Sequence, residues 1–184
     1  MQTSLIISGF GGQGVLFAGQ LLAHAALDAG KHVTWIPSYG PEMRGGTAHC
    51  TVVISDAPIG SPLTRHPDIA LALNQPSAVK YAPLVALGGL LVVNTSLAPL
   101  PETRPDVRRV GVAANQLAED AGELRLANVV MLGALLAARP VLPPEAVEQA
   151  LERYLPERHR KLLAANRAVA SKLFDLGVPF VRRV

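Results

Sequence analysis

Six residues near the start of the chain have types and a spacing that could bind a phosphate group. They are Gly9-Phe10-Gly11-Gly12-Gln13-Gly14, which gives the spacing G-x-G-x-x-G with an additional glycine at position 12. A loop of this kind turns tightly and lets backbone N–H groups approach an anion, and the dipole of a following helix favours a negative charge there. The motif predicts a ligand site, with a tight turn that only lets the next helix pack closely on a sheet as the alternative.

A second loop combines charged, aromatic and flexible residues. Its sequence is Ser38-Tyr39-Gly40-Pro41-Glu42-Met43-Arg44-Gly45-Gly46. Arg44 could pair with a phosphate, and it could instead form a local salt bridge with Glu42. The glycines could serve positive φ angles rather than the approach of a ligand. We therefore expect the loop either to face a ligand or to pack as an ordered loop against a partner subunit.

A dinucleotide-binding oxidoreductase is an alternative that the second strand weakens. In such a site an acidic residue usually closes the second strand, about 20 residues after the glycines. Here that strand ends in Ile36-Pro37-Ser38, and Glu42 lies beyond it in the loop. The Gly-Lys-Ser/Thr triplet of a Walker loop is also missing after the glycines. A free-standing NAD(P)-binding enzyme and a scaffold without a ligand both stay open as alternatives.

The elements around the loops alternate between strand and helix. Apolar residues predict a strand over 3–8, a helix over 15–29 and a second strand over 31–36 that Pro37 ends. A strand over 47–55 would bury Ala48, Cys50, Val52 and Ile54 on one face. Further strands are predicted over 68–74, 90–93 and 107–112, and helices over 76–87, 113–121, 126–138, 143–154 and 158–176.

This order predicts an α/β fold with a mostly parallel, Rossmann-like sheet and helices on both faces. We expect one domain over residues 1–184, with a helical C-terminal region over about 126–184. Ligands of such folds bind outside the carboxyl ends of the strands. Both loops, together with Asn74 and Asn94, follow strands and are expected to line one edge of the sheet.

The composition of the chain excludes several classes of protein. The chain has 184 residues, of which 49% are apolar and 17% charged, which excludes a disordered chain. The formal net charge of +3 comes without a dense basic run, so no nucleic-acid partner is expected. The apolar runs are too short for a signal peptide or a membrane span, and we expect a cytoplasmic protein.

The chain lacks the residues for several kinds of chemistry. Cys50 is its one cysteine, so it can form neither an internal disulfide nor a four-cysteine iron–sulfur cluster. Cys50 is expected to be a small buried apolar residue. No His, Cys and acid set has metal-ligand spacing, and no nucleophile motif or acid pair can be placed. We therefore assign no catalytic and no metal-binding residue.

The two loops together resemble the gamma subunit of 2-oxoacid:ferredoxin oxidoreductases. The resemblance rests on Gly9–Val15, on Ser38–Gly46 and on the following strand that carries Cys50. It covers most of the chain, and the helices from about Pro143 onward carry little of it. Further matches are Ile59-Gly60-Ser61-Pro62, Pro67-Asp68 before a strand, and Asn128–Gly133.

This resemblance implies a subunit of a multisubunit enzyme. The family decarboxylates a 2-oxoacid on thiamine diphosphate, reduces ferredoxin through iron–sulfur clusters and transfers the acyl group to coenzyme A. Thiamine diphosphate and the clusters would belong to partner chains, namely alpha and beta subunits and in some enzymes a ferredoxin-like delta subunit. The substrate stays open among pyruvate, 2-oxoglutarate, 2-oxoisovalerate and indolepyruvate.

The resemblance also implies a role for the two loops, because the equivalent domain of related fused enzymes helps to hold coenzyme A. The isolated chain would be inactive. The candidate coenzyme-binding residues are Gly9, Gly11, Gly12, Gln13, Gly14, Ser38, Tyr39, Gly40, Glu42, Arg44, Gly45 and Gly46.

Overall fold

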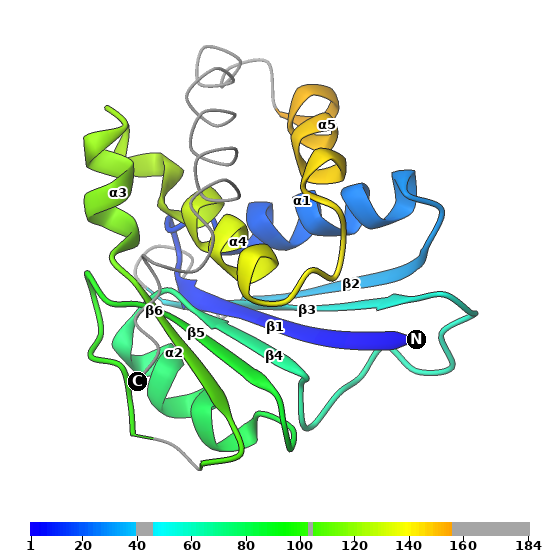
Figure 1. Ribbon diagram of the computed structural model, residues 1–184, viewed down its shortest axis with the longest axis horizontal. Coiled ribbons are helices and arrows are strands. Elements are labelled where there is room, and N and C mark those ends of the chain that lie inside the picture. The colour runs from blue at the N-terminus through cyan, green and yellow to red at the C-terminus, as the bar shows by residue number, and fades with distance from the viewer. Residues whose placement is uncertain (40–45, 103–104, 156–184) are drawn as a thin grey trace.

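Strand β1 (Gln2–Phe10) lies inside a six-stranded sheet, between β3 and β4. The computed structural model describes residues 1–39, 46–102 and 105–155 (Figure 1). The strand order is β2-β3-β1-β4-β5-β6. The remaining strands are β2 (His32–Tyr39), β3 (Thr47–Ser55), β4 (Ile69–Ala72), β5 (Leu90–Asn94) and β6 (Arg108–Val112).

Five of the strands run in one direction and β3 runs in the other. Strands β1, β4, β5 and β6 pair in parallel. Strand β3 is antiparallel to both β1 and β2, so β2 points the same way as β1. The reversal follows from chain length, because residues 40–46 between β2 and β3 are too few for the crossover that a parallel neighbour needs. The predicted mostly parallel sheet is confirmed, with β3 as the exception.

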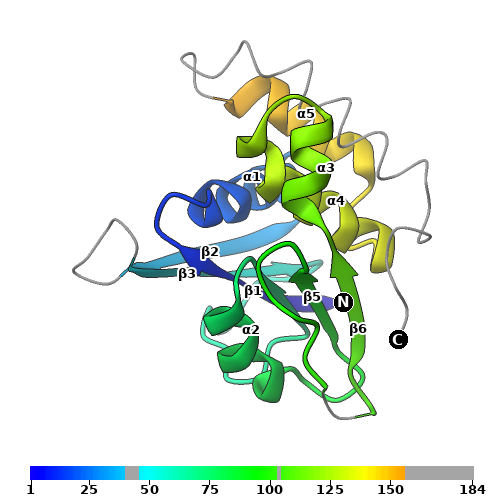
Figure 2. The same cartoon turned by 90° about the vertical axis from the view of Figure 1, so that its left-hand side faces the viewer.

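Helices cover both faces of this sheet, as predicted (Figures 1 and 2). One face carries α1 (Val15–Asp28), α3 (Ala114–Asp120), α4 (Ala127–Ala138) and α5 (Pro144–Tyr154), whose buried side chains share one apolar core. The opposite face carries α2 (Gln75–Tyr81), followed by the short 3-10 turn η1 (Ala82–Leu84). A second 3-10 turn, η2 (Leu124–Leu126), precedes α4.

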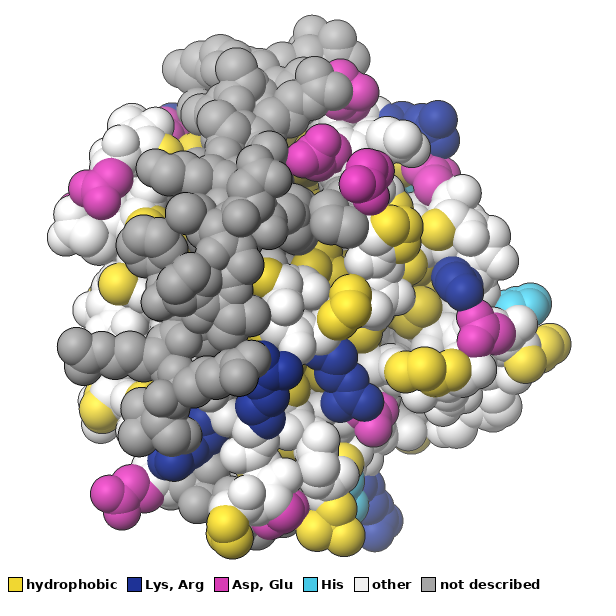
Figure 3. All heavy atoms as spheres, in the orientation of Figure 1, with side chains coloured by type: hydrophobic (Ala, Val, Ile, Leu, Met, Phe, Trp, Pro, Cys, Tyr) yellow, Lys and Arg dark blue, Asp and Glu magenta, His cyan; other side chains and the backbone are white. Residues whose placement is uncertain are grey.

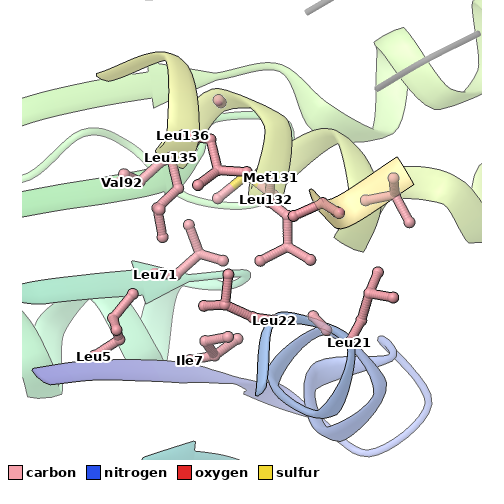
Figure 4. Close-up of a cluster of buried hydrophobic side chains, with 14 of the residues drawn as sticks. Leu5, Ile7, Leu21, Leu22, Leu71, Val92, Met131, Leu132, Leu135 and Leu136 are labelled. Carbon is pink, nitrogen blue, oxygen red and sulfur yellow. The ribbon is translucent and has the colours of Figure 1, made fainter. Parts of the chain in front are cut away.

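Alternation along β1 divides the core into two layers. Leu5 and Ile7 point towards α1, whereas Ile6 packs in the smaller core with α2. Figure 4 shows the larger core, in which leucines of α1 and α4 meet β1, β4 and β5. Its labelled side chains are Leu5, Ile7, Leu21, Leu22, Leu71, Val92, Met131, Leu132, Leu135 and Leu136.

Two predicted element ends were wrong. Strand β2 does not end at Pro37 but continues to Tyr39, with Pro37 paired opposite Cys50. This is possible because β2 is an edge strand, which tolerates the missing N–H of proline. The helix expected over 76–87 is shorter and passes into η1. The helix predicted over 158–176, and with it most of the helical C-terminal region beyond α5, lies outside the described residues.

Helix α1 lies directly against the sheet at Gly19. A Cβ at this position would overlap Cys50 Sγ and would lie 3.1 Å from Trp35 Nε1. Cys50 is fully buried, as predicted, and this burial raises the pKa of its thiol to about 12. Because Cys50 stays a neutral thiol at neutral pH, it serves here as a packing group.

We expect Gly19→Ala to lower the free energy of unfolding by about 1–3 kcal/mol, since the added methyl group overpacks the contact with Cys50. This cost opposes the gain of roughly 1 kcal/mol that alanine brings to a helix. Urea unfolding followed by the fluorescence of Trp35, the one tryptophan, measures it. In a Cys50→Ala background the same substitution should cost less, and an equal cost in both backgrounds would contradict the contact.

Candidate ligand-binding loops at the carboxyl edge of the sheet

The carboxyl ends of five strands lie at one edge of the sheet. The glycine loop follows β1 at this edge, and β3 begins there because Thr47 pairs with Phe10. Asn94 ends β5, and Asn74 follows β4, whose Ala72 pairs with Ser8. The prediction that these segments lie together at one edge of the sheet is therefore confirmed.

The glycine loop reverses the chain between β1 and α1 with two left-handed residues. Gly12 has φ 100° and Gly14 has φ 73°, values that residues with a side chain rarely adopt. The Gly11 N–H donates to the carbonyl oxygen of Gly46 at 2.9 Å. This bond joins the glycine loop to the end of the second loop, just before β3.

Gln13 turns its side chain back into the protein. Its Oε1 accepts the Phe10 N–H at 2.6 Å and the Asn74 Nδ2 at 3.1 Å. Its Nε2 donates to the carbonyl oxygen of Leu73 at 3.4 Å. The side chain thus ties the glycine loop to the segment after β4, which is a positioning role that the spacing of the motif did not indicate.

Two glycines of the motif are required by packing. A Cβ on Gly9 would lie 2.6 Å from Gln13 Oε1 and 3.1 Å from Leu73 Cβ. A Cβ on Gly14 would overlap the side-chain amide of Asn128, whose Nδ2 donates to the Gly14 carbonyl at 3.2 Å. Asn128 is buried at the start of α4. Gly9 thus lets Gln13 and Val15 pack close to β1, and Gly14 makes room for Asn128 of α4.

The same loop also leaves hydrogen-bond donors free. No side chain caps the amino end of α1, and the described residues provide no acceptor for the N–H groups of Gly12, Val15 and Leu16. Gly12 is exposed, and nothing lies within 4 Å of a Cβ placed on it. Free amides and the positive end of a helix dipole at an accessible loop form a site that can hold an anionic oxygen group.

The second loop is described at its two ends. Ser38 is exposed near the end of β2, Tyr39 is the last residue of that strand, and Gly46 accepts the bond from Gly11. Gly40, Glu42, Arg44 and Gly45 lie outside the described residues, so the contact of these residues with a cofactor stays a prediction.

Buried asparagines hold this edge of the sheet together. Asn74 caps α2 by accepting the Ser77 N–H at 3.0 Å. Asn94 Oδ1 accepts the Ala114 N–H at 3.1 Å, and its Nδ2 donates to Asn115 at 2.8 Å. Because Asn74 and Asn94 stand at the ends of strands in the sequence, their location at this edge could be predicted. The contact of Asn128 with the glycine loop carried no such signal, because the two are far apart in the sequence.

The described part of the chain offers neither a membrane span nor a metal site. No helix there is long and apolar enough to cross a membrane. No group of three or more His, Cys, Asp and Glu side chains within these residues could hold a metal ion. On the face shown in Figure 3, Lys and Arg side chains stand in separate groups among apolar and acidic ones.

The sequence of this chain is similar to those of known proteins. A family model described as pyruvate ferredoxin/flavodoxin oxidoreductase matches residues 4–176. Ketoisovalerate oxidoreductase subunit VorA of Methanothermobacter thermautotrophicus is 48% identical over 131 residues, which are 71% of this chain and 27% of VorA. The chain thus spans about a quarter of the length of this relative.

Solved structures share the fold. The gamma subunit of a keto/oxoacid ferredoxin oxidoreductase from Geobacter sulfurreducens superposes with a TM-score of 0.83 at 31% identity, covering 99% of both chains. A 2-oxoglutarate:ferredoxin oxidoreductase from Magnetococcus marinus, solved with 2-oxoglutarate, coenzyme A and succinyl-CoA bound, has a TM-score of 0.85. At 21% identity over 96% of this chain and 31% of that one, the latter shows the fold alone.

We expect Gln13→Ala to lower the free energy of unfolding by about 1–3 kcal/mol, because it removes the partly buried acceptor of Phe10 and Asn74. Hydrogen exchange at the Phe10 amide should become faster, which mass spectrometry or NMR can measure. Gln13→Glu keeps an acceptor oxygen and should preserve most of this protection. Gln20→Ala, an exposed glutamine on α1, is the matched control. Unchanged exchange at Phe10 in the Gln13→Ala variant would contradict the assignment.

Proposed function

This chain belongs to the pyruvate ferredoxin/flavodoxin oxidoreductase family, as a gamma-type subunit, and we propose that it helps its enzyme to hold coenzyme A. The single observation that supports this role is the set of unpaired backbone N–H groups at Gly12, Val15 and Leu16. A diphosphate is the kind of group that such a loop binds best, because each donor faces an anionic oxygen without a competing side chain.

The chemistry of the whole enzyme extends beyond this chain. Thiamine diphosphate supplies carbanion stabilisation when bound, and iron–sulfur clusters supply electron transfer to ferredoxin. We assign both to partner chains, namely alpha and beta subunits with a ferredoxin-like delta subunit in some assemblies. The isolated chain would then be inactive, and a cytoplasmic location stays a prediction.

The substrate of the enzyme is proposed only as a 2-oxoacid, without a choice of one compound. The relative from Methanothermobacter is named for ketoisovalerate, and the structural neighbour from Magnetococcus was solved with 2-oxoglutarate and coenzyme A. These two proteins are thus named for different oxoacids, and one of them was solved with coenzyme A bound. We therefore place the choice of oxoacid in the partner chains and a contact with coenzyme A in this one.

A scaffold without a ligand is the second candidate, favoured by the inward side chain of Gln13. Under this alternative the glycines only allow the close approach of α1 and Asn128. A free-standing NAD(P) enzyme has less support, since β2 ends without an acidic residue in Ser38-Tyr39. The scaffold and the coenzyme site differ in one measurable respect, which is the response of coenzyme A binding to a charge at the glycine loop.

Substituting Gly12 with aspartate or asparagine tests that response. The two side chains have nearly the same shape and enter open space, so both meet the same backbone strain at φ 100°. In the assembled enzyme we expect Gly12→Asp to raise the KM for coenzyme A at least about tenfold above that of Gly12→Asn, because its carboxylate repels a phosphate. The KM for the oxoacid should be the same in both variants.

The matched control is the same pair of substitutions at Gly30, which also has a positive φ and open space but lies beyond the far end of α1. Arg44→Ala is an additional variant, expected to weaken coenzyme A binding if its guanidinium pairs with a phosphate. An equal KM for coenzyme A in both Gly12 variants would overturn the proposed site and favour the scaffold.

A further inference from the structure

Three polar side chains lie in a row on the face of the sheet opposite α1. His49 of β3 pairs with Ser8 of β1 on one side and with Ser38 of β2 on the other. Directly paired residues of adjacent strands place their side chains on the same face, about 5 Å apart. The row lies next to the carboxyl edge, one residue pair further along β3 than Ala48 and two beyond Thr47.

Helix α2 borders this row with an aromatic ring and a lysine. Ser8 Oγ and Ser77 Oγ are hydrogen-bonded at 2.9 Å, which holds α2 against β1. The buried ring of Tyr81 lies 6.0 Å from the ring of His49, and Lys80 Nζ lies 5.0 Å from the centre of the Tyr81 ring. The two basic side chains thus stand near the same aromatic ring.

Neither base forms an ion pair with an acidic side chain of the described residues. The pKa of His49 is lowered by burial and, to a lesser degree, by the charge of Lys80. Lys80 and Tyr81 are the titratable groups that face His49 from α2, and Ser8 and Ser38 face it uncharged from β1 and β2. In Figure 2, α2 lies beneath β1, and none of the described helices lies beneath β2 and β3.

We propose that His49, Lys80 and the Ser38 hydroxyl form a binding site for the phosphate monoester of a small molecule, separate from the glycine loop. A phosphate monoester carries a charge of nearly −2 at neutral pH, which matches one ammonium and one imidazolium. Lys80 supplies a point charge, and the imidazole and the hydroxyl supply directional donors. Ser8 is excluded as a ligand because its hydroxyl is already bonded to Ser77 and is buried.

The bound phosphate changes the protonation of His49. In the free protein the imidazole is neutral at pH 7, since burial and Lys80 both disfavour its charge. A phosphate beside it favours the charged form, so binding raises the pKa of His49 and takes up a proton. Because a phosphate monoester loses its second charge near pH 6, its affinity should increase as the pH falls from 8 to about 7.

NMR of the full chain tests this with inorganic phosphate as the probe. The chain has five histidines, and His49→Gln identifies the signal of His49. We expect phosphate to raise the apparent pKa of His49 and to leave His66 unchanged, because His66 is bonded to the Leu84 carbonyl away from the row. Lys80→Gln should weaken the affinity for phosphate, measured from the change in the His49 signal, at least threefold. Lys80→Arg should keep the affinity of the unmodified chain. An equal response to chloride at matched ionic strength, or an equal response in Lys80→Gln, would overturn the site.

Coenzyme A and dephospho-coenzyme A identify whether the coenzyme is the source of this phosphate, because they differ only in a phosphate monoester. This arm rests on the proposed function. The assembled enzyme should bind coenzyme A at least fivefold more tightly than the dephospho form, and Lys80→Gln should abolish the difference. Equal binding of both compounds by the unmodified enzyme would exclude the coenzyme as the source. The response of His49 to inorganic phosphate would still decide the site, so this result and a failure at Gly12 are distinguishable.

Discussion

The close packing of α1 against the sheet, directly after β1, is the constraint on which the rest of the structure depends. β1 is buried on both faces, so the chain must leave it at the carboxyl edge and reverse within residues 11–14. That reversal requires positive φ at Gly12 and Gly14, and it leaves the first N–H groups of α1 without an acceptor among the described residues. One local backbone solution therefore serves the packing of the core and creates the donors of the proposed coenzyme site.

A partly buried network of polar side chains holds this reversal in place. Gln13 and Asn74 bridge the glycine loop to the segment after β4, and Asn128 binds the loop from α4. Each of these amides satisfies backbone groups that would otherwise be buried without partners, which is costly in a low-dielectric interior. The site is thus supported by three separate segments of the chain, and its geometry depends on the whole sheet edge.

Much of the fold could be predicted because the strong signals were local. Continuous apolar runs marked β1, β4 and β5, and glycine at position 30 marked the end of α1. Pro37 misled the prediction of β2, since an edge strand such as β2 has a neighbour on one side only and tolerates a proline whose missing N–H is not needed for pairing. The end of α2 was placed too late because the chain passes into a 3-10 turn.

The sequence by itself determined the strand–glycine loop–helix unit, the alternation of elements and the resemblance to the family, since these depend on neighbours in the chain. Tertiary structure decided which residues serve the site. It turned Gln13 towards Asn74, brought Asn128 onto Gly14, and set His49 near Tyr81 of α2. These contacts join segments far apart in the sequence, and only the register of the strands and the packing of α2 and α4 on the sheet bring them within reach.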